Sequence, residues 1–185
     1  MDHHQGHERG PLDDVFEDLE QQAVGIELAE RDAELADRVR GEYASVTLAD
    51  RVHASVGRQV VLVLSGGETV TGEVTEAGVD WCTVSSPQGR TWLVRLGAVA
   101  VARGLSPRAV PEPARPVVAR LGFGSAFHRL ADGCADLRLH LDTGSAPRVR
   151  LGRVGADFVE VELEQEGRVA SELVAIGAIR AVVVG

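Results

Sequence analysis

Apolar and polar side chains alternate in short runs between residues 60 and 101, and glycine or proline follows each of the first four runs. Alternation over four to eight residues predicts half-buried strands, because successive side chains of a strand point to opposite faces. Gly66 and Gly67 supply the positive φ angles that a tight hairpin turn needs. We therefore predict five short strands that form a small closed or half-closed sheet. The runs cover residues 60–65, 69–75, 81–85, 91–95 and 98–101.

A second, degraded copy of this pattern begins 77 positions later. The matches fall at turn glycines and at inward-facing strand positions, and after a three-residue insertion they continue through residues 173–179. This spacing predicts an internal duplication. A single continuous sheet, or unrelated topologies on the two sides of Pro111, would contradict a duplicated folding unit whose halves are bridged by the linker. Matched pairs are Val60/Leu137, Leu62/Leu139, Leu64/Leu141, Gly67/Gly144, Gly78/Gly155 and Trp81/Phe158.

A longer period governs residues 11–46, where apolar side chains recur at steps of three and four and the opposite side is mainly acidic. This pattern predicts a long amphipathic helix. Such a helix cannot easily bury its whole apolar stripe on one small domain. It therefore either lies across both β units or pairs with another chain. The residues expected at this helix interface are Leu12, Phe16, Leu19 and Ile26.

The predicted fold is mainly β with α: two tandem five-stranded small barrels, each preceded by a short helix, and a long acidic N-terminal helix. Four prolines between Gly104 and Arg120 predict an extended, semi-rigid linker. The predicted parts are a disordered tail (1–10), the acidic amphipathic helix (11–46), barrel 1 (47–104), the proline-rich linker (105–121) and barrel 2 (122–185).

Residues 64–74, LSGGETVTGEV, resemble the first signature of the Sm/LSm family: a hydrophobic strand, a small turn, then Val-x-Gly-x-Val. Residues 93–99, LVRLGAV, resemble a loose form of its second signature. The resemblance implies a helix that leads into a strongly bent five-stranded barrel, over about residues 47–103 and more weakly 125–184.

The Sm/LSm family reads uridine with an Asp and an Asn after the second strand and with an Arg-Gly pair in the second signature. Here Gly78 and Cys82 stand near the first two positions, and Leu96 separates Arg95 from Gly97. The resemblance therefore carries over the fold and none of the nucleotide contacts.

Charge is distributed unevenly along the chain. Residues 1–50 hold 14 acidic and 4 basic side chains, a net of −10, and the remainder holds 14 acidic and 15 basic, a net of +1; together these give the formal net charge of −9. Every basic residue is arginine. Because the acidity lies in the predicted helix, a local arginine patch on the β units can still attract anions.

Candidate anion or partner contacts lie in the second copy. Arg148 and Arg150 alternate with apolar residues and share one exposed face, with Arg138 beside them, and Arg95 is a further candidate from the first copy. Residues 160–166 carry an acidic row on the next strand. The two rows either pair across the sheet or leave a footprint for an anion or a nucleic acid.

The sequence shows no motif typical of a catalytic or metal-binding site. It contains no phosphate-binding loop, no paired Cys or His spacing of metal type and no serine nucleophile elbow. Cys82 and Cys134 are expected to be reduced thiols. No apolar run is long enough to span a bilayer. We predict a cytoplasmic protein with no enzyme activity, metal, cofactor, membrane contact or small-molecule substrate.

Two classes of function remain. We expect a non-catalytic interaction or scaffold protein, built on tandem Sm-like barrels, that binds a protein partner or self-associates. The alternative is an RNA-binding Sm-like regulator, whose affinity would come from arginines that neutralise phosphates. The net charge of −9 and the lack of lysine favour the first class.

Overall fold

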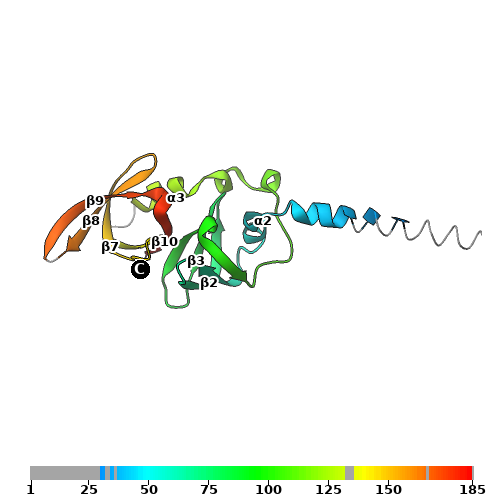
Figure 1. Cartoon of the computed structure of the whole chain (residues 1–185), viewed down its shortest axis with the longest axis horizontal. Coiled ribbons are helices and arrows are strands. Elements are labelled where there is room, and N and C mark those ends of the chain that lie inside the picture. Colours follow the sequence, from blue (N-terminus) through cyan, green and yellow to red (C-terminus); the bar gives the residue numbers. More distant parts are fainter. Residues whose placement is uncertain (1–29, 32–33, 36, 132–135, 166, 185) are drawn as a thin grey trace, which may run out of the picture. The chain divides into compact units, whose positions relative to one another are not determined.

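The computed structural model describes residues 30–31, 34–35, 37–131, 136–165 and 167–184 (Figure 1). The chain divides into two compact units, Met1–Ser45 and Val46–Gly185. In the first unit, the described residues between 30 and 44 are helical, which agrees with this part of the predicted acidic helix.

An apolar stripe is visible on the described part of this helix. Leu35, Val39 and Tyr43 are exposed and follow one another at the four-residue spacing that places side chains on one helix face. The expected helix interface lies outside the described residues, as does the predicted tail. The residues concerned are Leu12, Phe16, Leu19 and Ile26.

The second unit is built on one antiparallel sheet of ten strands in the order β5-β1-β2-β3-β4-β10-β6-β7-β8-β9. The predicted mainly β architecture is therefore confirmed, whereas two separate barrels are not, because hydrogen bonds run across the whole sheet. The strands are β1 (Gln59–Leu64), β2 (Thr69–Ala77), β3 (Trp81–Ser85), β4 (Thr91–Arg95), β5 (Val99–Arg103), β6 (Asp136–Leu141), β7 (Arg148–Val154), β8 (Phe158–Gln165), β9 (Arg168–Ala175) and β10 (Ile179–Val184).

Short helices join and cover the strands. Helix α2 (Leu48–His53) begins at Thr47 in a capping box, in which Thr47 Oγ1 accepts from the Asp50 N–H and the Asp50 carboxylate accepts from the Thr47 N–H. Helix α3 (Phe123–Ala131) lies before β6 in the chain, as α2 lies before β1. The remaining helices are one-turn 3₁₀ segments: η1 (Leu96–Ala98), η2 (Glu112–Ala114), η3 (Val117–Arg120) and η4 (Ile176–Ala178).

We call β1–β5 the first half of the sheet and β6–β10 the second half. The predicted linker is ordered by contacts with the first half and with α2, the helix that precedes it. It contains η2 and η3 rather than a fully extended chain, and Arg115 between them is buried. Its Nη2 donates to Asp50 Oδ1 at 2.5 Å, and its Nε donates to the carbonyl of Val110 at 3.2 Å. The linker is thereby fixed to α2.

The two halves place the same features at corresponding positions. Gly78 N–H donates to the Trp81 carbonyl and Gly155 N–H to the Phe158 carbonyl, both at 2.8 Å. A Cβ at either glycine would overlap the neighbouring aromatic ring, at 2.2 Å from Trp81 Nε1 and 2.5 Å from Phe158 Cε1. Strand β6 lies 77 positions after β1, and η4 lies 80 positions after η1. Each half has the strand order fifth, first, second, third, fourth.

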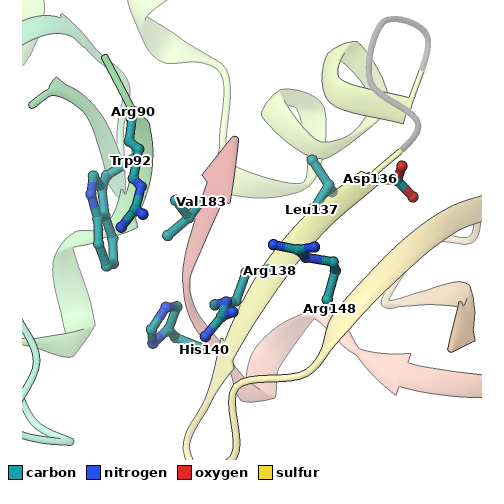
Figure 2. A pocket seen from close by; sticks show the side chains of 8 residues that line it. All are labelled: Arg90, Trp92, Asp136, Leu137, Arg138, His140, Arg148 and Val183. Atoms are coloured by element: carbon teal, nitrogen blue, oxygen red, sulfur yellow. The ribbon is translucent and has the colours of Figure 1, made fainter. Parts of the chain in front are cut away.

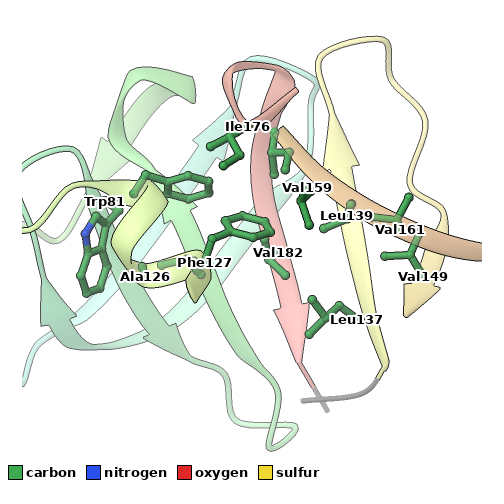
Figure 3. Close-up of a cluster of buried hydrophobic side chains, with 13 residues drawn as sticks. Trp81, Ala126, Phe127, Leu137, Leu139, Val149, Val159, Val161, Ile176 and Val182 are labelled. Carbon is green, nitrogen blue, oxygen red and sulfur yellow. The ribbon is translucent and has the colours of Figure 1, made fainter. Parts of the chain in front are cut away.

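Strands β4 and β10 join the halves. Leu93 lies opposite Val182, and Val94 lies opposite Ala181. Leu93 and Val182 belong to the core that packs beneath α3, whereas Val94 and Ala181 belong to the core of the first half. Figure 3 shows Phe127 of α3 and Val182 of β10 directed into the same cluster. Each half therefore contributes a strand to the core of the other.

Candidate functional site

A row of side chains crosses four strands at the joint between the halves. Trp92 on β4 lies opposite Val183 on β10, Val183 lies opposite Arg138 on β6, and Arg138 lies opposite Arg148 on β7. Directly opposite residues of an antiparallel pair project to the same face. Since neighbouring strands are about 4.8 Å apart, the row runs about 14 Å from an aromatic end to a cationic end.

This row forms the floor of a cavity of about 510 Å³, which we call the seam pocket. Arg90, in the turn before β4, lies on one side of it, and Arg138 and Arg148 lie on the other (Figure 2). The volume falls in the range of small-molecule sites in proteins. The lining residues are Arg90, Trp92, Asp136, Leu137, Arg138, His140, Arg148 and Val183.

Among the described residues, the arginines of the seam pocket, Arg90, Arg138 and Arg148, have no anionic partner at ion-pair distance. The one carboxylate in the lining, Asp136, lies 4.0 Å from Arg150 Nε. Because like charges at facing positions of a sheet repel, the Arg138–Arg148 pair weakens the fold that holds it.

A buried polar cluster lies beside the pocket and connects the two halves. Glu68, in the turn between β1 and β2, accepts from Arg180 Nη2 at 2.9 Å through Oε1, and the same oxygen lies 3.3 Å from His140 Nδ1. The Arg180 guanidinium occupies the space where Gly66 lacks a side chain, since a Cβ there would lie 1.3 Å from it. Among the described residues, Glu68 Oε2 and His140 Nε2 are buried without a hydrogen-bond partner.

The charge of Glu68 is stabilised within this cluster. Burial raises the pKa of Glu68, but hydrogen bonds from its own backbone and from His140, together with the positive charge of Arg180, outweigh burial and hold the pKa below its ordinary value. A carboxylate whose pKa is lower in the folded than in the unfolded state contributes stability above the unfolded pKa, about 4.3 for glutamate. That contribution is lost as the pH falls through the folded-state pKa.

Replacing Glu68 by Gln should lower the free energy of unfolding by roughly 1–3 kcal/mol at pH 7, because Arg180 then keeps its charge in a buried site without a carboxylate. The difference from wild type should shrink as the pH falls through the folded-state pKa of Glu68. Urea unfolding between pH 7 and pH 3 measures both effects. Glu164→Gln, at an exposed position on β8, is the matched control and should change stability by less than about 0.5 kcal/mol. Equal stabilities of the two variants at pH 7 would contradict the assignment.

The predicted anion contacts separate into three environments. Arg138 and Arg148 come together in the seam pocket, as the alternation suggested. Arg150 lies opposite Glu162 on β8, so at this position the basic and acidic rows meet across the sheet. Arg95 is half-buried, donates through Nη2 to the Ile176 carbonyl at 2.6 Å and lies over the Phe123 ring. Arg95 thus helps to hold the halves together.

Sequence reasoning missed Arg90, Trp92 and His140 as pocket residues. Trp92 and His140 stand outside the motifs found in the sequence. Their rings lie 5.1 Å apart between centroids, one on each side of the β4–β10 joint. The one signal in the sequence was the position of Arg90 and Trp92 at the start of a strand whose outer edge had no predicted partner.

The two outer strands of the sheet form a second candidate surface. Leu173 on β9 corresponds to Leu93 on β4, yet 67% of Leu173 is exposed against 3% of Leu93. Val101 on β5 corresponds to Ala181 on β10, with exposures of 42% and 0%. The inner members lie in cores at the β4–β10 joint: Leu93 packs in the cluster that includes Phe127 of α3, and Ala181 packs in the core of the first half. The outer members, Val101 and Leu173, lie on β5 and β9, which each lack a neighbouring strand on one side in the described sheet.

The described residues contain no metal-binding cluster, and Cys82 among them is buried. Over these residues, no three His, Cys, Asp or Glu side chains are placed to hold a metal ion. Burial raises the pKa of the Cys82 thiol to about 12, so Cys82 is a neutral core residue rather than a nucleophile. Cys134 lies outside the described residues. None of the described helices has the length and apolar character needed to cross a membrane.

Comparison with known proteins adds no relative. No protein-family model matches the chain, and no curated protein is similar to it in sequence.

Proposed function

We propose that this protein is a non-catalytic assembly module whose copies associate edge to edge, with β9 of one copy pairing with β5 of the next. The observation that carries this proposal is the contrast between inner and outer strands: Leu173 and Val101 are exposed where their counterparts Leu93 and Ala181 are buried. Exposed apolar edge strands are templates for pairing with another chain. The β4–β10 joint shows the geometry that such a pair can adopt.

The register of the joint can be transferred to the outer edges. In the joint, Trp92 lies opposite Val183 and Leu93 opposite Val182. Adding 80 to the β4 residues and subtracting 80 from the β10 residues places Glu172 opposite Arg103 and Leu173 opposite Ala102. The transferred register therefore sets an acidic residue against a basic one across the proposed interface, which favours this pairing.

An interface between two different edges is heterologous, so it either closes into a ring or continues as a filament. We propose that the chain itself arose by fusion of two Sm-like units, with β4–β10 as the internal copy of this interface. The corresponding turns, glycines and 3₁₀ segments of the two halves support this proposal. The uninterrupted β4–β10 pairing accounts for one sheet in place of two separate barrels.

Replacing Leu173 by Arg should weaken self-association at least tenfold. The substitution removes an apolar side chain worth about 1.5–3 kcal/mol when buried, and each 1.4 kcal/mol is a factor of ten in the dissociation constant. Sedimentation velocity over a range of protein concentrations measures the effect. Val117→Arg, at an equally exposed position in η3 away from both edges, is the matched control and should assemble like wild type. A wild-type chain that stays monomeric at high concentration would refute the proposal.

Exchanging charges across the edge tests the register itself. Arg103→Glu should weaken assembly, because it places two acidic residues face to face, and Arg103→Glu combined with Glu172→Arg should restore it. Failure of the double variant to recover, when each single variant folds normally, would contradict the transferred register.

A further inference from the structure

The seam pocket combines three features that the assembly proposal does not use. It gathers three arginines, and its floor is apolar at the opposite end. His140, which also lines it, has a buried ring nitrogen without a hydrogen-bond partner among the described residues. We propose that the seam pocket binds a phosphate ester that carries a planar ring, which is the chemistry of a nucleotide.

The cationic end fits a phosphate group. Arg138 and Arg148 face each other on neighbouring strands, and Arg90 lies across the cavity from them (Figure 2). A planar guanidinium presents its donors in a fork that matches phosphate oxygens, and such contacts are about twice as strong as neutral hydrogen bonds. A bound dianion turns the repulsion between Arg138 and Arg148 into two attractions. The arrangement is therefore unfavourable when the pocket is empty and favourable when an anion is bound.

The other end of the row fits a flat, apolar group. Trp92 and Val183 lie side by side on β4 and β10 and provide the apolar part of the lining. Tryptophan is the aromatic side chain with the largest surface for stacking, and bases of all kinds stack on such platforms. With an aromatic end and a cationic end on one row, the pocket distinguishes a phosphate ester with a ring from phosphate alone.

His140 supplies a polar contact beside this row, next to Trp92. Its side chain is nine-tenths buried, its Nδ1 faces Glu68, and among the described residues its Nε2 has no hydrogen-bond partner. A buried polar atom without a partner costs stability that a ligand group can recover. His140 lies on β6 on the same face as Arg138, two residues away and opposite Ala181, so its ring borders the row that a ligand would cover.

Isothermal titration calorimetry on the full chain tests the proposal with four probes: adenosine monophosphate, adenosine, inorganic phosphate and a short 5′-phosphorylated oligoadenylate. Adenosine monophosphate should bind at least tenfold more tightly than adenosine or inorganic phosphate, because only it engages both ends of the row. Tighter binding of the oligoadenylate than of the mononucleotide would identify a nucleic-acid strand as the source of the phosphate ester, and equal affinity would identify a free nucleotide. The absence of binding by both nucleotide probes at millimolar concentration overturns the proposal.

Single substitutions locate the site. Arg138→Ala and Arg148→Ala should each weaken nucleotide binding about tenfold, whereas Arg153→Ala should leave it unchanged. Arg153 lies on the same strand as Arg148 and has the same charge, but it pairs with Glu160 outside the pocket. Equal loss in all three variants would mean non-specific attraction to positive charge and would overturn the proposal. Trp92→Leu should reduce the affinity for adenosine monophosphate at least threefold and leave the affinity for inorganic phosphate unchanged. Equal affinities of wild type and Trp92→Leu for adenosine monophosphate would contradict the proposed stacking of a planar ring on Trp92.

Thermal unfolding without ligand provides an independent readout. Removing either member of the facing Arg138–Arg148 pair should raise the melting temperature of the ligand-free protein, since it relieves like-charge repulsion. Adenosine monophosphate should then stabilise wild type and Arg153→Ala but not Arg148→Ala. A lower melting temperature of Arg148→Ala in the absence of ligand would show that the pair has a structural role and would overturn the proposal.

Discussion

Replacing Arg115 by Ala should lower the free energy of unfolding by about 3–5 kcal/mol, the range for breaking a buried ion pair from one side. The side chains of Arg115 and Asp50 are 5% and 10% exposed, so the variant leaves the Asp50 carboxylate charged and largely away from water. Burial raises the pKa of Asp50, but hydrogen bonds from Thr47 and Arg115 outweigh it and hold the pKa below its ordinary value. Chemical denaturation at pH 7 measures the loss.

Two further variants separate the ion pair from general effects. Arg108→Ala, on the exposed part of the same linker, should change stability by less than about 0.5 kcal/mol. In an Asp50→Asn background, Arg115→Ala should cost clearly less than in wild type, because no carboxylate is then left uncompensated. Since the folded-state pKa of Asp50 is lowered, the cost should be fully present above about pH 4 and should fall as the pH drops through that pKa. Equal costs in both backgrounds would rule out the pair as the cause.

Replacing Phe127 by Ala should lower the free energy of unfolding by about 3–5 kcal/mol, the usual cost of removing a buried phenylalanine. Phe127 on α3 is fully buried, and its ring lies 5.3 Å from that of Phe123. It contacts a core that includes Trp81 and Leu93 from the first half of the sheet (Figure 3). The loss of stability should therefore affect both halves of the sheet together.

Tryptophan fluorescence makes this cooperativity measurable, because Trp81 and Trp92 both lie in the first half whereas Phe127 lies in the second. In Phe127→Ala, the unfolding midpoint from fluorescence should shift by as much as the midpoint from circular dichroism. Val52→Ala, in the core of the first half, is the converse variant and should also shift both probes together. A fluorescence midpoint that stays at the wild-type value in Phe127→Ala would show that the halves unfold separately.

Local signals in the sequence predicted the elements well. Thr47 and Asp50 have the spacing of a capping box, and the helix begins there. The predicted strands 81–85 and 91–95 match β3 and β4 at both ends, because turn residues bound them on each side. The alternation of Arg148 and Arg150 predicted one shared face for these two side chains, and in the structure Arg148 lies opposite Arg138 and Arg150 opposite Asp136.

The joint between the halves could not be read from the sequence. Pairing of β4 with β10 depends on two edges that are about 90 residues apart, and no turn or period between them specifies the contact. Trp92 and His140 become pocket residues only through that contact. The linker turns escaped prediction for a related reason, since η2 and η3 are held in place by Arg115 and its distant partner Asp50.

The central position of β10 has a consequence for biosynthesis. This strand fills the gap between β4 and β6, yet it follows every other strand in the chain. Until the ribosome has synthesised β10, β4 and β6 therefore each have an edge without a hydrogen-bonded neighbour. The nascent polypeptide exposes these two strand edges, which β10 covers in the complete protein. Polypeptides released before Ile179 keep β4 and β6 as additional unpaired edges, so premature termination should yield a chain that is more prone to aggregate than the complete sheet.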